Sequence, residues 1–112
     1  HLSLRRQRQL SIRDRICLGA DVVSTDFDIW KKVHHVNLDS VFLGCKYAVP
    51  VMGKYGHGSI INISSGAGIM GFPLRSPYAA SKGAVISLTR QMSLDYIKSN
   101  IRDCIKNFSI SI

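Results

Sequence analysis

Two patterns of residues between positions 64 and 82 could carry chemistry, and they predict different sites. Gly66, Gly68 and Gly71 form the spacing G-x-G-x-x-G, which is typical of loops that bind the pyrophosphate of a dinucleotide. Tyr78 and Lys82 lie four residues apart, a spacing that places a phenol and an ammonium group on one face of a helix. The first pattern indicates a cofactor loop, and the second indicates a pair that transfers protons.

The glycine pattern lacks the context that a pyrophosphate loop requires. Such a loop connects a strand directly to a helix, because the N-terminus of the helix has to face the phosphate groups. Here Pro73 and Pro77 follow the glycines, and each proline disfavours helix at the residue before it. We therefore interpret the three glycines as a turn at the end of a strand and expect no pyrophosphate to bind there.

The tyrosine and lysine pair is the stronger candidate for a catalytic site. A phenol with a pKa near 10 is a poor base at neutral pH, and an ammonium group within about 4 to 6 Å favours its ionised form. By itself, a pair with this spacing is better explained as an exposed helix surface without a function. The interpretation therefore depends on the sequence around the pair.

That surrounding sequence resembles the short-chain dehydrogenase/reductase family. The stretch "NISSGAGIMGFPLRSPYAASKGAVISLTRQMSLDY" contains the family's serine followed by its Tyr-x-x-x-Lys motif. Ser65 stands thirteen residues before Tyr78 and matches the family's catalytic serine, whereas Ser64 does not. Upstream, "VNLDSVFLGCKYAVPVM" resembles the helix that carries the family's fourth catalytic residue, here Asn37.

The resemblance implies a role for each of the four matched residues. Tyr78 would be the general acid/base that exchanges a proton with the substrate oxygen, and Lys82 would lower the pKa of Tyr78 and bind the nicotinamide ribose beside it. Ser65 would donate a hydrogen bond to the substrate oxygen, and Asn37 would hold a water that links Lys82 to solvent. Hydride transfer would use NAD or NADP, and the substrate would be an alcohol or a carbonyl compound. Taken singly, Ser65 is also explained as a strand-end cap and Asn37 as a residue at a helix kink.

Apolar periodicity predicts a long helix in the first half of the chain. Ser24 or Thr25 is expected to cap a helix that runs through "DFDIWKKV". Apolar residues then recur at intervals of three and four from Trp30 to Met52, which is typical of an amphipathic helix. Pro50 is expected to kink or end this helix, because proline lacks the backbone N–H that a helix interior requires.

The second half of the chain is expected to contain strand, helix and strand. Residues 58–65, "GSIINISS", are expected to form a buried strand of the parallel type. Ser76 is expected to cap a helix that runs to about Ile97, with Pro77 in its first position. The alternation of Phe108, Ile110 and Ile112 indicates a final strand.

This order of elements and the resemblance predict an α/β fold: a partial Rossmann-like, doubly wound parallel sheet that forms part of a short-chain dehydrogenase domain. We divide the chain into a basic N-terminal segment at 1–24, a catalytic core at 25–102 and a divergent C-terminal end at 103–112. The family's opening strand, glycine loop and helix, which bind the adenosine half of the cofactor, have no counterpart in the sequence. We therefore interpret the chain as a truncated piece of a dehydrogenase.

Composition and charge bear on the remaining function classes. The 112 residues carry a net charge of +8, and residues 1–19 hold five arginines against one aspartate. We interpret this basic arm as a solvated terminus and keep nucleic-acid binding as the weaker alternative, because no aromatic residues are interleaved for base stacking. Three widely spaced cysteines fit a reducing, cytoplasmic compartment, and no apolar run reaches the roughly 18 residues of a membrane span. His34 and His35 point apart on a helix, so no metal site is expected.

Two functions remain open from the sequence. The first is an NAD(P)-dependent oxidoreductase that interconverts an alcohol and a ketone. The second is a catalytically inactive fragment that acts as a helix-mediated dimerisation module. In the family, the helices of the Asn37 and Tyr78 type commonly pair with those of a second subunit, so the resemblance implies a homo-oligomer through the two long helices.

Overall fold

A computed structural model describes the backbone of residues 20–108 and the side chains of residues 20–102. Most of the basic N-terminal segment and the residues Ile110 and Ile112 lie outside the described residues. The elements are α2 (Phe27–His34), a π-helical turn (His35–Asp39), α3 (Ser40–Tyr55), β1 (Gly58–Ser65), a 3-10 turn (Gly66–Gly68), α4 (Ser76–Asp95), a 3-10 turn (Ile97–Ser99) and β2 (Ile101–Phe108). This α/β order confirms the predicted fold class.

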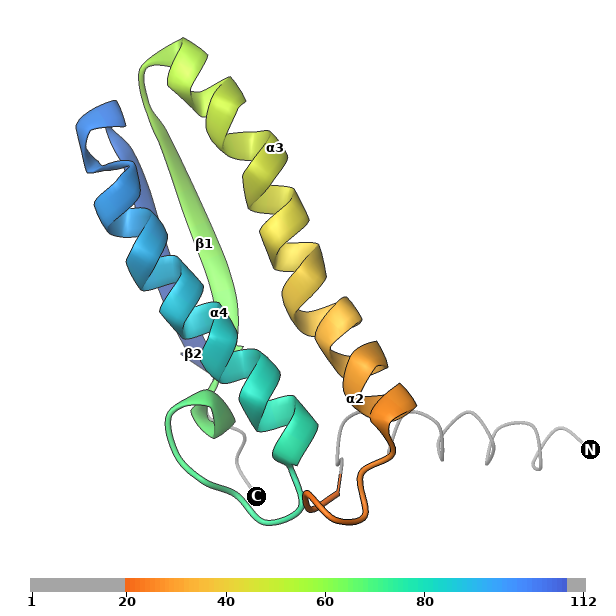
Figure 1. Ribbon diagram of the computed structural model, residues 1–112. Helices are drawn as coiled ribbons and strands as arrows, with labels where there is room; N and C mark the ends of the chain where they lie inside the picture. Colours follow the sequence, from red (N-terminus) through yellow and green to blue (C-terminus); the bar gives the residue numbers. More distant parts are fainter. Residues whose placement is uncertain (1–19, 109–112) are drawn as a thin grey trace, which may run out of the picture.

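The helix α2, the π-helical turn and α3 form one continuous rod (Figure 1). The prediction that Ser24 or Thr25 caps this rod was wrong, because the N-cap is Asp26. Both hydroxyl groups instead donate hydrogen bonds back to Asp21, so they close a turn before the helix begins. Asp28 in the first turn is favourable there, because the N-terminus of a helix carries partial positive charge.

The rod does not end at Pro50. It continues to Tyr55 and ends at Gly56, which has a φ of 76° and whose N–H donates to the carbonyl oxygen of Gly53. Glycine adopts this left-handed conformation without steric cost, so it commonly terminates helices. Pro50 is therefore tolerated inside the helix, and the end of the helix is set six residues later.

The two strands form a parallel sheet in which Gly58 pairs with Ile101 and Ser65 pairs with Phe108. The strand predicted at 58–65 is confirmed, whereas β2 begins earlier than the alternation at Phe108 indicated. Both α3 and α4 lie on the same face of this sheet (Figure 1). On the opposite face, Ile61 and Ile63 are 58% and 52% exposed, so the expectation of a fully buried strand holds for one face only.

The core lies between α4, the rod and the covered face of the sheet. α4 begins at Ser76, one residue after its N-cap at Arg75, and ends at Asp95 rather than near Ile97. Its buried residues form a stripe that includes two hydroxyl side chains: Pro77, Ser81, Val85, Ile86, Thr89 and Met92. Within residues 20–108, no helix combines the length and apolar character needed to cross a membrane.

Candidate active site

Tyr78 and Lys82 lie in the first two turns of α4 and share a face, as their spacing predicts. The Nζ atom of Lys82 is 5.8 Å from the centre of the Tyr78 ring, and both residues are half-buried. The same Nζ atom donates a hydrogen bond of 3.3 Å to the carbonyl oxygen of Ile63 in β1. The pair is therefore located at the carboxyl end of a parallel strand, which is where open α/β sheets bind their ligands.

Ser65 is the last residue of β1, and it is only 3% exposed. Its Oγ atom accepts a hydrogen bond of 3.2 Å from the backbone N–H of Ala67, and so caps the 3-10 turn at Gly66–Gly68. Accepting this bond uses a lone pair and leaves the hydroxyl proton for donation. The cap and a role as a hydrogen-bond donor to a substrate are therefore compatible.

Asn37 occupies the centre of the π-helical turn, a conformation that is found frequently at functional sites. Its Nδ2 atom donates a hydrogen bond of 3.1 Å to Oγ of Ser81, and Ser81 in turn donates one of 2.7 Å to the carbonyl oxygen of Tyr78. Asn37 is thereby connected through Ser81 to the helical turn that carries Tyr78 and Lys82. The link joins residues that are 44 positions apart in the sequence.

The end of β1 is also held against the backbone of Lys82. The hydroxyl of Ser64 donates a hydrogen bond of 2.8 Å to the carbonyl oxygen of Lys82. Two residues earlier in β1, Nδ2 of Asn62 donates to Oγ1 of Thr89 at 2.9 Å, and the Sγ atom of Cys45 approaches Oδ1 of Asn62. These buried polar contacts set the position of α4 along β1, because each donor meets its acceptor in one arrangement only.

The three glycines form a turn at the end of the strand, as interpreted from the sequence, and α4 starts five residues after Gly71. Gly68 approaches α4 closely: a Cβ atom there would lie 2.8 Å from the carbonyl carbon of Lys82 and 2.9 Å from the nitrogen of Gly83. At Gly66 the nearest atom to such a Cβ is a ring carbon of Phe72 at 3.9 Å, and Gly71 faces open space. Of these three glycines, only Gly68 therefore lies where the backbone of α4 leaves no room for a side chain.

Two buried serines that position the site, Ser64 and Ser81, were not predicted from the sequence as part of it. The alternation of side chains along a strand puts Ser64 on the same, helix-facing side as Asn62, which is a signal present in the sequence. Ser81 follows Tyr78 by three residues, a spacing at which a serine hydroxyl can reach back to a helix carbonyl. The contact between Ser81 and Asn37 is not indicated by any pattern in the neighbouring sequence.

The segment before α2 meets the start of α4. The backbone N–H of Ser76 donates a hydrogen bond of 3.1 Å to the carbonyl oxygen of Ala20. Next to Ala20, Ser24 donates hydrogen bonds to the carboxylate of Asp21 from both its hydroxyl and its backbone N–H, and these bonds lower the pKa of that carboxyl below 3.8. The turn at residues 21–24 thus orders the chain beside the first turn of α4.

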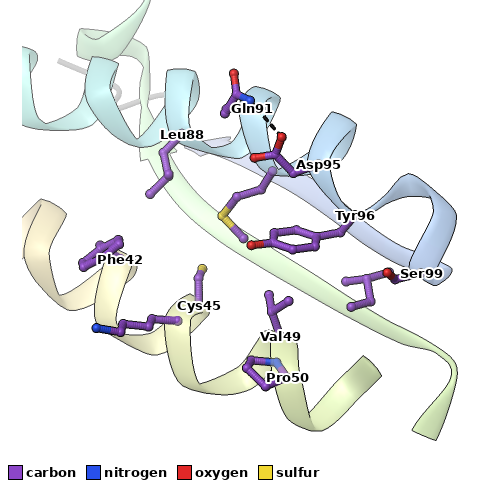
Figure 2. Close-up of a pocket in the computed structure, with 12 residues that line it drawn as sticks. Phe42, Cys45, Val49, Pro50, Leu88, Gln91, Asp95, Tyr96 and Ser99 are labelled. Carbon is purple, nitrogen blue, oxygen red and sulfur yellow. Dashed lines mark hydrogen bonds between the residues drawn. The ribbon is translucent and has the colours of Figure 1, made fainter. Parts of the chain in front are cut away.

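A groove of about 520 Å³ lies between α3 and α4, away from the candidate catalytic residues. Figure 2 shows Phe42, Cys45 and Val49 of α3 facing Leu88 and Tyr96 from the other side. The far end of the groove is formed by Asp95 and Ser99. None of the four candidate catalytic residues lines the groove, so it is a separate feature.

Comparisons with known proteins agree on one family. A model of the short chain dehydrogenase family matches residues 19–105. The chain is 44% identical over 79 residues to 2-(R)-hydroxypropyl-CoM dehydrogenase of Xanthobacter autotrophicus, an alignment that covers 70% of this chain and 32% of the relative. It is 41% identical over 81 residues to a protein of the same organism that is named inactive 2-(S)-hydroxypropyl-CoM dehydrogenase 2, covering 72% of this chain and 35% of the relative.

A solved structure gives the same result. A gluconate 5-dehydrogenase from Burkholderia cenocepacia, solved in complex with NADP and tartrate, superposes with a TM-score of 0.79 and 35% identity. The superposition covers 81% of this chain and 36% of that chain. The chain thus spans about a third of the length of the curated relatives and the solved structure that it matches.

Proposed function

Because this chain belongs to the short-chain dehydrogenase family, we propose that it carries the catalytic segment of an NAD- or NADP-dependent oxidoreductase that interconverts an alcohol and a ketone. The observation that carries the proposal is the position of Lys82. Its ammonium group lies beside the Tyr78 ring and is bonded to the carboxyl end of β1, two residues before Ser65. A phenol, an ammonium group and a hydroxyl are thus gathered at one edge of the sheet.

The residues present fit a nicotinamide cofactor. An ammonium group has three protons, and the bond to Ile63 uses one of them, so Lys82 retains donors for the hydroxyls of a ribose. Tyr78 is half-buried and thus accessible to a bound ligand. When bound, the nicotinamide would supply or accept the hydride.

In the proposed reaction each residue acts on the oxygen of the substrate or on a neighbour of that oxygen. The phenol of Tyr78 gives a proton to a carbonyl oxygen, or takes one from an alcohol. The hydroxyl of Ser65 donates a hydrogen bond to the same oxygen and stabilises the charge that develops there. Lys82 places positive charge beside Tyr78, and Asn37 holds a water that connects Lys82 with solvent.

The test uses a chimera in which residues 20–102 replace the corresponding segment of a complete short-chain dehydrogenase. The folded chimera is expected to reduce NAD or NADP with a panel of secondary alcohols, followed by the absorbance of the reduced nicotinamide. The matched control is the chimera with Lys82→Met, which keeps the length of the side chain and removes its charge, and it is expected to be inactive. A chimera that folds and binds cofactor but oxidises no alcohol would contradict the proposal, an outcome of interest because one relative is named inactive.

The second candidate function is self-association through the two long helices, and the groove between α3 and α4 favours it. Phe42 lines this groove and is 50% exposed, and the groove is mainly apolar. An apolar surface of this kind is stabilised when a partner covers it. In this proposal the partner is a second copy of the chain. We also propose that the protein is located in the cytoplasm.

A further inference from the structure

We propose that Ser81 is a positioning residue, which couples the π-helical turn at Asn37 to the part of α4 that carries Tyr78 and Lys82. The inference rests on the oxidoreductase function proposed above and adds a residue to it. Ser81 is not expected to touch substrate or cofactor, because its side chain is 0% exposed. It would act through the groups that it holds.

The hydroxyl of Ser81 is the centre of a short chain of hydrogen bonds. It accepts from Nδ2 of Asn37 at 3.1 Å and donates to the carbonyl oxygen of Tyr78 at 2.7 Å. A hydroxyl has one proton and two lone pairs, so both bonds can form at once with a single orientation. Ser81 itself is fully buried, so removing its hydroxyl deletes both bonds inside the packed interface between α4 and the π-helical turn.

This link reaches the candidate catalytic pair through the carbonyl oxygen of Tyr78. In an α-helix, the carbonyl of residue i accepts the N–H of residue i+4, which here is Lys82. The Ser81 hydroxyl is a second donor to the same oxygen. A single peptide oxygen is thus shared by the backbone of Lys82 and, through Ser81, by the side chain of Asn37.

A second serine in α4 separates this tertiary link from a purely local effect. Ser93 donates a hydrogen bond of 2.7 Å to the carbonyl oxygen of Arg90, which is the same three-residue spacing and the same length as the bond from Ser81 to Tyr78. The Ser93 bond is exposed and lies in the last turns of the helix. Removing the Ser93 hydroxyl deletes the local bond alone, so Ser93→Ala is the matched control.

The experiment is a double-mutant cycle in the chimera, with the variants Asn37→Ala, Ser81→Ala and the combination of the two. If the two residues act through one link, Ser81→Ala lowers kcat about 10- to 100-fold, while KM for the alcohol changes little, because misplaced catalytic groups slow the reaction more than they weaken binding. The double variant is then no slower than the slower single variant. Ser93→Ala keeps the kcat of the unmodified chimera.

Three results would overturn the proposal. These are an additive double variant, an equal loss of kcat in Ser93→Ala, and a Ser81→Ala variant that is folded and fully active. If Ser81→Ala fails to fold, Ser81→Cys replaces it in the cycle, since it keeps a slightly larger side chain with a polar hydrogen in place and weakens the hydrogen bonds, and it is expected to have an intermediate kcat.

A second measurement tests the Ser81 link independently of the proposed oxidoreductase function. If the unmodified chimera is folded but inactive, the oxidoreductase proposal fails. The link is then tested by the NMR signals of the Asn37 side-chain amide, which are expected to move in Ser81→Ala and to stay in place in Ser93→Ala. Unchanged signals in both variants would show that Ser81 does not hold Asn37.

Discussion

At the residue scale, Lys82 is where the parts of the candidate site meet. Its ammonium group contacts both the Tyr78 ring and β1, its carbonyl oxygen accepts the Ser64 hydroxyl, and its backbone is in close reach of Gly68. A lysine side chain has a long flexible stem, so its charge is well placed only when the backbone is held. The contacts around Lys82 hold it from the strand side.

Tyr78 is the residue on which the proposed chemistry depends. Tyr78→Phe keeps the ring and its packing and removes the proton that the proposed mechanism exchanges with the substrate oxygen. In the chimera, kcat is expected to fall by about 10²- to 10⁴-fold, the range for lost acid/base catalysis, with unchanged stability. Steady-state kinetics measure kcat, and thermal denaturation measures the stability. Tyr55→Phe, at an exposed position in the last turn of α3, is the control, and undiminished turnover in Tyr78→Phe would rule out the assigned role.

Gly68 provides a prediction that separates the two readings of the glycine pattern. Gly68→Ala is expected to destabilise the chimera by about 1 to 3 kcal/mol, because the added methyl group meets the backbone of Lys82 and Gly83. Gly66→Ala, which has room for a methyl group, is expected to change the free energy of unfolding by less than about 0.5 kcal/mol. Denaturant unfolding followed by circular dichroism measures both. Equal stabilities, together with loss of cofactor binding in Gly66→Ala, would favour a pyrophosphate loop instead.

At the element scale, the turn before α2 is expected to respond to pH. The hydrogen bonds from Ser24 lower the pKa of Asp21 in the folded chain, so the turn contributes stability above the unfolded value of about 3.8. This contribution is lost as the pH falls through the lower, folded pKa. An NMR titration of the Asp21 carboxyl is expected to show a rise in pKa in Ser24→Ala.

Thr25→Ala is the matched control for this titration. The Thr25 hydroxyl donates to the backbone carbonyl of Asp21 and not to its carboxylate, so the titration is expected to stay in place. Equal titration curves in all three proteins would mean that Ser24 does not hold the carboxylate in solution.

At the scale of the whole molecule, the described residues expose apolar side chains on one face of the sheet and in the groove between α3 and α4. Ile61 and Ile63 lie on the open face of β1, and Phe42 lines the groove between α3 and α4. Exposed apolar groups at both places favour association, since their burial is the main favourable contribution to assembly. In the proposed self-association, the second copy covers the groove between α3 and α4.

Phe42→Glu tests that surface in the 112-residue chain. If a second copy covers the groove, the variant is expected to raise the dissociation constant about 30-fold, which corresponds to the roughly 2 kcal/mol typical of a central aromatic contact. Tyr55→Glu, also in α3 but outside the groove lining, is expected to leave it unchanged. Sedimentation equilibrium measures both. A monomeric parent chain, or the same loss in Tyr55→Glu, would exclude this interface.

Features that depend on neighbours along the chain were determined by the sequence itself. The strand at 58–65 and the shared face of Tyr78 and Lys82 were both predicted, because strand alternation and the i, i+4 spacing of a helix are local geometry. The α/β order followed from the same periodicities. The four proposed catalytic residues came from a resemblance of motifs, and their roles remain predictions.

Helix boundaries were less predictable, because local preferences compete with packing. Ser24 and Thr25 are good caps, but their hydroxyls bond to Asp21 and leave the cap to Asp26. Pro50 disfavours a helix interior by about 3 kcal/mol, yet α3 continues past it, since most helix stability in proteins comes from tertiary packing. Both outcomes were decided by contacts that the local pattern does not contain.

Only the tertiary structure decided how the site is held together. The hydrogen bonds from Asn37 to Ser81 and from Ser64 to Lys82 join residues 44 and 18 positions apart, and the requirement for Gly68 exists because the 3-10 turn after β1 comes within contact distance of α4. Such contacts depend on how a strand and two helices dock, which periodicity does not specify. The sequence by itself therefore determined which groups could react, and the packing of α4 against β1 and the π-helical turn decided which other residues hold them in place.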